Sequence, residues 1–319
     1  MKKKLLVLIV VMCFVVSTFS TNVFTAENIS ESNSEYFYDY IEYDYETQKT
    51  TRYSVPATNS IQVNETWDLF DSQAVDSMKQ IAKDTIGGAN SNLSRTIIGE
   101  DQRFLSSPTD APYSSVALLI ATYDTDNNGT VDDSSCGTGF LVSKNVLVTA
   151  AHCVVPKEDI DTTKLVELKI YFGVHQYGAS LTGLSYEHPK KWTWTTNWHG
   201  SDGWMYDYCV IELHNDITRP YYFNCISSSN AATPQSIYAS GYPGDFQYYQ
   251  MTSFGQLTET AYNWCHYDND MVPGMSGGPL YTSTNCIGII TYQADTFNQG
   301  NLFTPSLYNL ICSKIVDNQ

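Results

Sequence analysis

Short apolar runs separated by turn residues dominate the chain from about Pro108 to its end. The runs are rich in Val, Ile, Tyr and Thr, and Gly, Asn and Pro stand between them. Such runs are typical of strands in a sandwich or barrel, so the pattern predicts an all-β domain. Seven of them are SSVALLIATY (114–123), TGFLVS (138–143), VLVTAAHC (146–153), ELKIYFGV (167–174), YCVIELH (208–214), SIYASGYP (236–243) and CIGIITYQ (286–293).

The rest of the chain has other patterns. PSLYNLICSKIV (305–316) has apolar residues at helical spacing and a proline near its start, which predicts a C-terminal helix. Residues 27–56 are acidic and rich in tyrosine without a clear period. Residues 66–95 have some helical spacing before a Gly/Asn/Ser cluster, and this cluster is typical of a linker.

The N-terminus has the pattern of a secretory signal. Three lysines precede an apolar run from Leu5 to Val16, which is twelve residues long. A membrane-spanning helix needs about 20 apolar residues, so the run is too short to be one. We therefore expect a signal peptide over 1–26 and a secreted, extracellular protein. Cleavage after Ser20, Thr25 or Ala26 fits equally well.

Composition sets broad limits. The chain has 319 residues, of which 42% are hydrophobic and 16% charged, and this is enough apolar material for one or two packed domains. The formal net charge is −17. Such a charge does not suit nucleic acid or anionic membranes, so we expect neither as a partner once the signal is removed.

Three residues suggest nucleophilic catalysis. His152 ends an apolar strand, Asp207 begins an alternating one, and Ser276 lies among glycines in MVPGMSGGPLYT (271–282). A serine hydroxyl needs a base to take its proton and a carboxylate to orient that base. Backbone N–H groups of Gly274 and Ser276 are spaced to form an oxyanion hole. The sequence therefore predicts a catalytic set of His152, Asp207 and Ser276.

The motifs around these residues resemble those of chymotrypsin-like serine endopeptidases, in particular the bacterial glutamyl-endopeptidase branch. The resemblance implies two six-stranded antiparallel β-barrels with a C-terminal helix and the active site between the barrels. His152 and Asp207 would come from the first barrel and Ser276 from the second. The motifs are TGFLVSKNVLVTAAHCV (138–154), DYCVIEL (207–213), SGYPGD (240–245), PGMSGGPLY (273–281) and IGII (287–290).

The resemblance also implies an inactive precursor. SRTIIGEDQR contains the expected processing site, with cleavage after Arg95 freeing Thr96. The domains would then be a propeptide over 27–95 and a protease domain over 96–319. The protease domain carries 9 basic and 22 acidic residues, a net charge of −13. We expect a monomer that meets protein or peptide substrates and an activating protease.

Seven cysteines remain after signal removal, so at least one does not pair within the chain. Cys136 with Cys153 would staple the strands that present His152, and an exported protein allows such a disulfide. We expect Cys209, within a buried strand, to be free. A Cys225–Cys312 bridge is implied by some trypsin-like relatives, which leaves Cys265 with Cys286.

The residue preference before the scissile bond stays open. Glutamate-specific relatives carry a histidine where this chain has Ile290, and threonine or serine where it has Met271. Asp270 occupies the place of the aspartate that selects Lys or Arg in trypsin-like enzymes. With Thr291, these residues are the predicted substrate pocket, for which acidic, basic and apolar preferences are all candidates.

Two further alternatives remain. DTDNNGTVDD (124–133) begins like a calcium loop, but its twelfth position is Ser135 rather than Glu, and an Asn-Gly hairpin explains it as well. We expect no metal and no cofactor.

The favoured function is a secreted serine endopeptidase that acts through an acyl-enzyme. The alternative is a non-catalytic or narrowly specific binder or toxin-like protein on the same fold.

Overall fold

The structure is a computed structural model, and it describes residues 37–56, 97, 100–155, 164–175, 180–228, 231–246, 248–283, 285–294 and 297–317. The predicted signal over 1–26, the stretch of helical spacing over 66–95 and the processing site Arg95–Thr96 lie outside these residues. No helix in the described part of the chain is long and apolar enough to cross a membrane.

The first barrel consists of six antiparallel strands in the order β7-β4-β5-β6-β9-β8. The ends of this sheet meet where Ile170 and Glu187 exchange backbone hydrogen bonds of 3.0 and 2.8 Å. All four residues of β6 are buried, because β6 lies between two strands and has core on both faces. The strands are β4 (Val116–Asp124), β5 (Asp133–Leu141), β6 (Val146–Thr149), β7 (Lys164–Phe172), β8 (Pro189–Thr195) and β9 (Cys209–Leu213).

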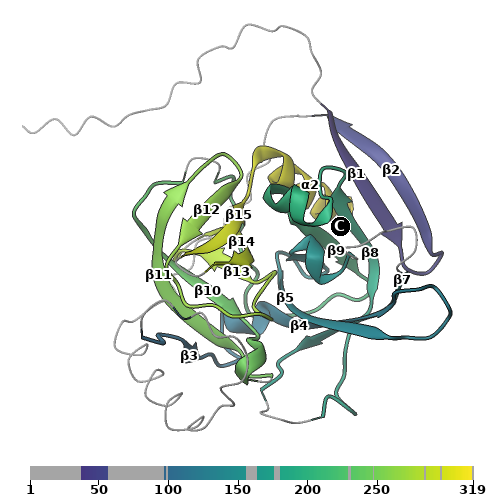
Figure 1. Cartoon of the computed structure of the whole chain (residues 1–319), viewed down its shortest axis with the longest axis horizontal. Coiled ribbons are helices and arrows are strands. Elements are labelled where there is room, and N and C mark those ends of the chain that lie inside the picture. Colours follow the sequence, from purple (N-terminus) through teal and green to yellow (C-terminus); the bar gives the residue numbers. More distant parts are fainter. Residues whose placement is uncertain are drawn as a thin grey trace, which may run out of the picture. The chain divides into compact units, whose positions relative to one another are not determined.

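The second barrel is closed, with the order β10-β13-β14-β15-β12-β11 and a further pairing of β10 with β11. The short strand β3 (Phe104–Leu105) adds to β11. Figure 1 shows this barrel in green to yellow, after the blue to teal first barrel. The strands are β10 (Gln235–Gly241), β11 (Met251–Thr260), β12 (Trp264–Tyr267), β13 (Pro279–Tyr281), β14 (Cys286–Gln293) and β15 (Asn298–Leu302).

The last described element is α2 (Pro305–Asp317), which contacts β6 and β9 of the first barrel. Its apolar residues Leu307, Leu310 and Ile311 are buried in the core that the first barrel provides. The predicted all-β class, the two six-stranded barrels and the C-terminal helix are therefore confirmed.

One element was not predicted. Residues of the acidic, tyrosine-rich stretch form a hairpin of β1 (Phe37–Asp44) and β2 (Lys49–Pro56), and β1 pairs antiparallel with β8 (Figure 1). The alternation of apolar and polar residues that predicts a strand was not apparent in this stretch, because aromatic and acidic residues are intermixed there. The fold thereby includes part of the predicted propeptide, while the domain boundary at Arg95 stays a prediction.

Candidate active site

His152 lies directly after the buried strand β6, in the 3-10 turn Ala151–Cys153. The turn is held by the Asp207 carboxylate, whose Oδ1 accepts a hydrogen bond of 2.9 Å from the His152 backbone N–H. The ring nitrogen Nδ1 lies 2.6 Å from Oδ2 of the same carboxylate. One aspartate therefore sets both the position of the turn and the orientation of the ring.

Asp207 lies between the 3-10 segment Gly200–Tyr206 and β9, so the first barrel supplies both groups. Burial of the His152 ring lowers its pKa, but the Asp207 carboxylate outweighs burial and holds the pKa well above the ordinary value of 6.5. The side chains of His152 and Asp207 are 19% and 10% exposed, so water screens their interaction only in part.

Ser276 lies in the turn before β13 of the second barrel, and its shape depends on glycines. Gly274 and Gly277 have φ of +100° and +85°, a region that favours glycine. A Cβ on Gly277 would lie 2.1 Å from the Thr138 carbonyl oxygen. Backbone bonds of 2.7 Å from Gly277 N–H to Ile290 and of 2.9 Å from Ile290 N–H to Gly278 attach the turn to β14.

The turn also presents two backbone donors. The N–H groups of Met275, Gly277 and Gly278 donate to backbone carbonyls. Those of Gly274 and Ser276 donate to no protein acceptor within the residues that the structure describes. Two unengaged N–H groups, one from the serine itself and one from two residues before it, are what stabilisation of an oxyanion requires.

Thr138 connects the two barrels at this point, and sequence reasoning did not single it out. Its N–H donates to the Ser276 carbonyl at 2.8 Å, and its hydroxyl donates to the Gly274 carbonyl at 2.8 Å. The same hydroxyl accepts a 3.0 Å bond from the Tyr242 N–H. Because these contacts cross between barrels, only its place beside Gly137 in the CGTGF motif could have indicated this role.

A cavity of about 760 Å³ brings the predicted groups together. His152 and Asp207 line it from the first barrel, and Gly274 and Ser276 line it from the second. No hydrogen bond joins the Ser276 hydroxyl to the His152 ring among the described contacts. Catalytic hydrogen bonds are often long in structures without substrate.

The predicted substrate pocket is divided. Met271 and Thr291 line the cavity, whereas Asp270 and Ile290 are not among its described lining residues. The Asp270 side chain is buried, and its Oδ2 accepts a 2.6 Å bond from the backbone N–H of Gln102. Ile290 is buried in the core of the second barrel. Sequence reasoning missed other lining residues, namely Trp198, Trp204, Tyr292, Gln293 and Gln299.

The seven described cysteines are all free thiols in this structure. The Cys136–Cys153 bridge is therefore not confirmed, although the two thiols are close enough to influence each other. Cys225 forms a β-bridge with Cys286. Strand β15 lies between the strands of Cys265 and Cys286, so those residues are about 9.5 Å or more apart and the suggested bridge is wrong.

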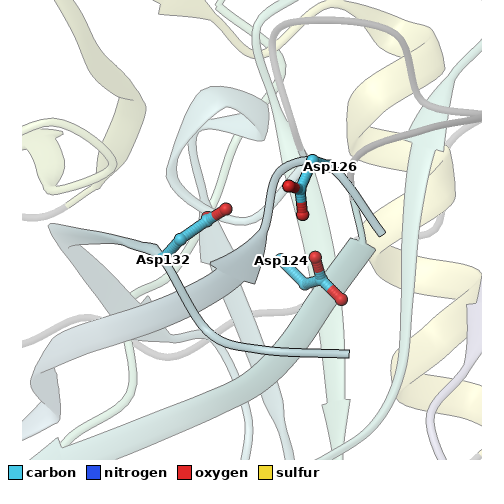
Figure 2. Close-up of side chains that lie close together, drawn as sticks. All are labelled: Asp124, Asp126 and Asp132. Atoms are coloured by element: carbon cyan, nitrogen blue, oxygen red, sulfur yellow. The ribbon is translucent and has the colours of Figure 1, made fainter. Parts of the chain in front are cut away.

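The acidic loop between β4 and β5 gathers three carboxylates. Ligand atoms of Asp124, Asp126 and Asp132 lie within 4.8 Å of one another (Figure 2). Asp124 already accepts bonds of 3.0 and 2.7 Å from the backbone N–H groups of Asn128 and Gly129. These bonds account for the loop as a hairpin tip, and calcium binding stays an open alternative.

Known proteins are similar to this chain in sequence and in fold. Residues 137–289 match the family described as "Trypsin-like peptidase domain". The chain is 27% identical over 225 residues to a Bacillus subtilis (strain 168) protein named "Extracellular metalloprotease", covering 68% of each. In this chain His152 and Asp207 bind each other at the cavity, and the described cluster of three possible metal ligands is the loop of Figure 2.

Two solved structures are similar in fold. A Glu endopeptidase is 24% identical, with a TM-score of 0.55, over 70% of this chain and 100% of its own. Protease Anisep from Arthrobacter nicotinovorans is 16% identical, with a TM-score of 0.50, over 66% and 99%. Residues 137–289 thus match a trypsin-like peptidase domain, which agrees with the resemblance of the sequence motifs and supports the prediction of a serine-type endopeptidase.

Proposed function

We propose that the protein hydrolyses peptide bonds of protein substrates through an acyl-enzyme on Ser276. The Ser276 oxygen attacks the carbonyl carbon while Nε2 of His152 takes its proton, and Asp207 stabilises the resulting imidazolium. The N–H groups of Gly274 and Ser276 bind the oxyanion. His152 then gives the proton to the leaving amine, and water releases the acyl group by the same steps.

One observation carries this proposal. A histidine held through Nδ1 by a carboxylate faces the same cavity as a serine that glycines expose. A ring that donates from Nδ1 has Nε2 as its proton acceptor, which is the tautomer that a general base needs. A protein that only binds its partner has no need for this arrangement.

The proposed substrate side chain before the scissile bond is uncharged. The described lining residues of the cavity include no Lys, Arg or Glu, and the carboxylate of the lining residue Asp207 is bound to His152. Polar groups there are already engaged, because Gln293 Nε2 donates to the Met271 carbonyl at 2.8 Å and the Thr291 hydroxyl donates to the Gln299 carbonyl at 3.2 Å. A charged substrate side chain would lose water there without gaining a partner of opposite charge that is not already engaged.

Secretion and activation complete the proposal. The basic and apolar N-terminus supports export, and the Bacillus subtilis relative is named as extracellular. Cleavage after Arg95 by another protease would convert the precursor into the mature enzyme that begins at Thr96, as SRTIIGEDQR suggests. The activated enzyme would then work as an extracellular monomer on protein substrates.

The test uses the secreted chain, incubated with a denatured protein mixture, beside its Ser276→Ala variant. Mass spectrometry identifies the new termini that depend on the serine. We expect cuts mostly after uncharged residues, and cuts mainly after Glu or after Lys and Arg would contradict the proposed pocket. Equal products from both proteins, with Thr96 confirmed as the N-terminus, would support the binder or toxin-like alternative.

A further inference from the structure

The hairpin β1–β2 is hydrogen-bonded to the first barrel as an additional pair of strands. Residues Tyr40–Asp44 of β1 pair in register with Lys191–Thr195 of β8. The pairing continues beyond the strands, where the Tyr45 N–H donates to the Lys190 carbonyl at 2.9 Å. At the other end, the Thr196 N–H donates to the Asp39 carbonyl at 3.1 Å. The hairpin thus covers the outer edge of β8.

Apolar side chains of the hairpin enter the core of the first barrel. Tyr40 and Ile41 are 1% and 8% exposed and belong to that core. The Tyr40 hydroxyl donates to the Ser306 carbonyl in α2 at 3.1 Å. The ring of Tyr43 lies 4.6 Å from that of Trp192, measured between centroids. These contacts remove aromatic surface from water on both partners.

A cluster of charges fastens the hairpin to two further elements. Glu42 pairs with Lys191 of β8 at 3.0 Å and with Lys314 of α2. Lys314 also pairs with Glu212 of β9 at 3.0 Å, and its side chain is 8% exposed. The two carboxylates of this cluster now balance the charges of its two lysines. Removal of Glu42 would leave both lysines with Glu212 alone. A buried cation that loses a partner is costly.

We propose that residues 37–56 stay bound to the peptidase domain after the chain is cut upstream of Thr96, as a non-covalent part of the mature enzyme. This rests on the processing step of the proposed function. Without the hairpin, β8 would expose an unpaired edge of five residues with the sequence KWTWT. Such an edge invites pairing with other chains.

The bound hairpin does not block the active-site cavity. None of the described residues that line the cavity belongs to 37–56. The described contacts of the hairpin are with β8 and the adjoining His188, with α2, and with His214 after β9, and the charge cluster includes β9. A bound hairpin therefore leaves Ser276 accessible, and retention is compatible with an active enzyme.

The test uses a precursor of residues 27–319 with Ser276→Ala, in which a recognition sequence for a specific protease is inserted at 91–95. After cutting, native size-exclusion chromatography and mass spectrometry show whether both fragments elute together. We expect co-elution in equal amounts, with separation only in denaturant. Elution of the 27–95 fragment by itself would overturn the proposal. Because this precursor has no nucleophile, failure of the proposed proteolytic function would not change the outcome.

Two charge reversals refine the test. Glu42→Lys places a cation against Lys191 and Lys314. Glu46→Lys makes the same change at a turn position of the same hairpin, where the side chain is 68% exposed and its described ion pair is a 3.7 Å contact with His214. We expect Glu42→Lys to weaken retention of the cut fragment at least about a hundredfold and Glu46→Lys to change it little. Equal retention of the two variants would contradict the role of the charge cluster.

Discussion

The Asp207 carboxylate binds His152 twice: it accepts a 2.9 Å bond from the backbone N–H of His152, and it lies 2.6 Å from Nδ1 of the His152 ring. The first contact fixes the turn on which the histidine lies, and the second fixes the ring. The orientation of the proposed general base therefore depends on one side chain that lies 55 residues further along the chain.

Replacement of Asp207 tests this relationship. Asp207→Asn keeps the shape of the side chain but favours the wrong tautomer of His152, so we expect kcat to fall roughly 10⁴-fold. Steady-state kinetics on a peptide substrate would measure it. Asp202→Asn, five residues earlier, provides the comparison, and a larger loss there would identify Asp202 as the orienting group instead.

The pH dependence of activity follows from the same pair. His152 must be neutral to accept a proton, and Asp207 holds its pKa above 6.5, so the acid limb of kcat/KM should lie above pH 6.5. In Asp207→Asn the acid limb of the activity profile should move to lower pH. An unchanged limb in the variant would argue against the coupling between the two side chains.

The same ion pair contributes to the stability of the fold. Its contribution is fully present below about pH 6.5 and disappears as pH rises through the raised pKa of His152.

Gly274 tests the proposed oxyanion hole. A Cβ there would lie 2.5 Å from the Tyr242 carbonyl oxygen, so Gly274→Ala should displace the donor N–H and reduce kcat by about 10²–10³-fold. Gly129→Ala is a matched control, because Gly129 has a similar φ of +87° but open space around it. Similar losses of activity in both variants would show that backbone strain alone explains the effect.

Arg103 should matter for stability. Its side chain is fully buried and forms two hydrogen bonds of 2.9 and 2.7 Å with Asp245, besides its contacts with Asp101. Arg103→Met should lower the free energy of unfolding by about 3–5 kcal/mol, because it removes the cation that pairs with the buried carboxylate of Asp245. Urea unfolding of the Ser276→Ala chain would measure this.

The control for Arg103 is an exposed ion pair. Lys144 and Asp216 are 48% and 54% exposed, so Lys144→Met should cost no more than about 1 kcal/mol. A loss at Arg103 no larger than that at Lys144 would show that the buried cluster is not needed for the fold.

Retention of the hairpin should weaken in acid. Burial raises the pKa of Glu42, but its bonds with Lys314 and Lys191 outweigh burial and lower the pKa below 4.5. The stabilisation is therefore present above about pH 4.5 and is lost as pH falls through the lowered pKa. Glu212 and Tyr53 also lie near Lys314, so the Glu42→Gln variant is needed to isolate this titration. Chromatography of the cut precursor from pH 6 to pH 3 would detect the release, which Glu42→Gln should not show.

Local sequence patterns predicted most of the barrels and the types of the proposed catalytic residues. Apolar runs such as VLVT before His152 specify a buried strand by themselves, because burial on both faces requires continuous apolar residues. The glycines around Ser276 likewise indicate a turn with an exposed hydroxyl, since only glycine readily adopts positive φ. These features depend on neighbours in the sequence.

The remaining features depend on contacts between distant residues. Asp270 was a candidate for substrate binding, but it accepts the N–H of Gln102, 168 residues away. Tyr40 reaches Ser306 across 266 residues, and this contact joins a segment without clear periodicity to the last helix. The sequence by itself determined strands, turns and the kinds of reactive groups, because these follow from local spacing. Only the tertiary structure decided which carboxylates face the cavity and where the hairpin binds, because burial and pairing are set by whichever distant segment packs beside each residue.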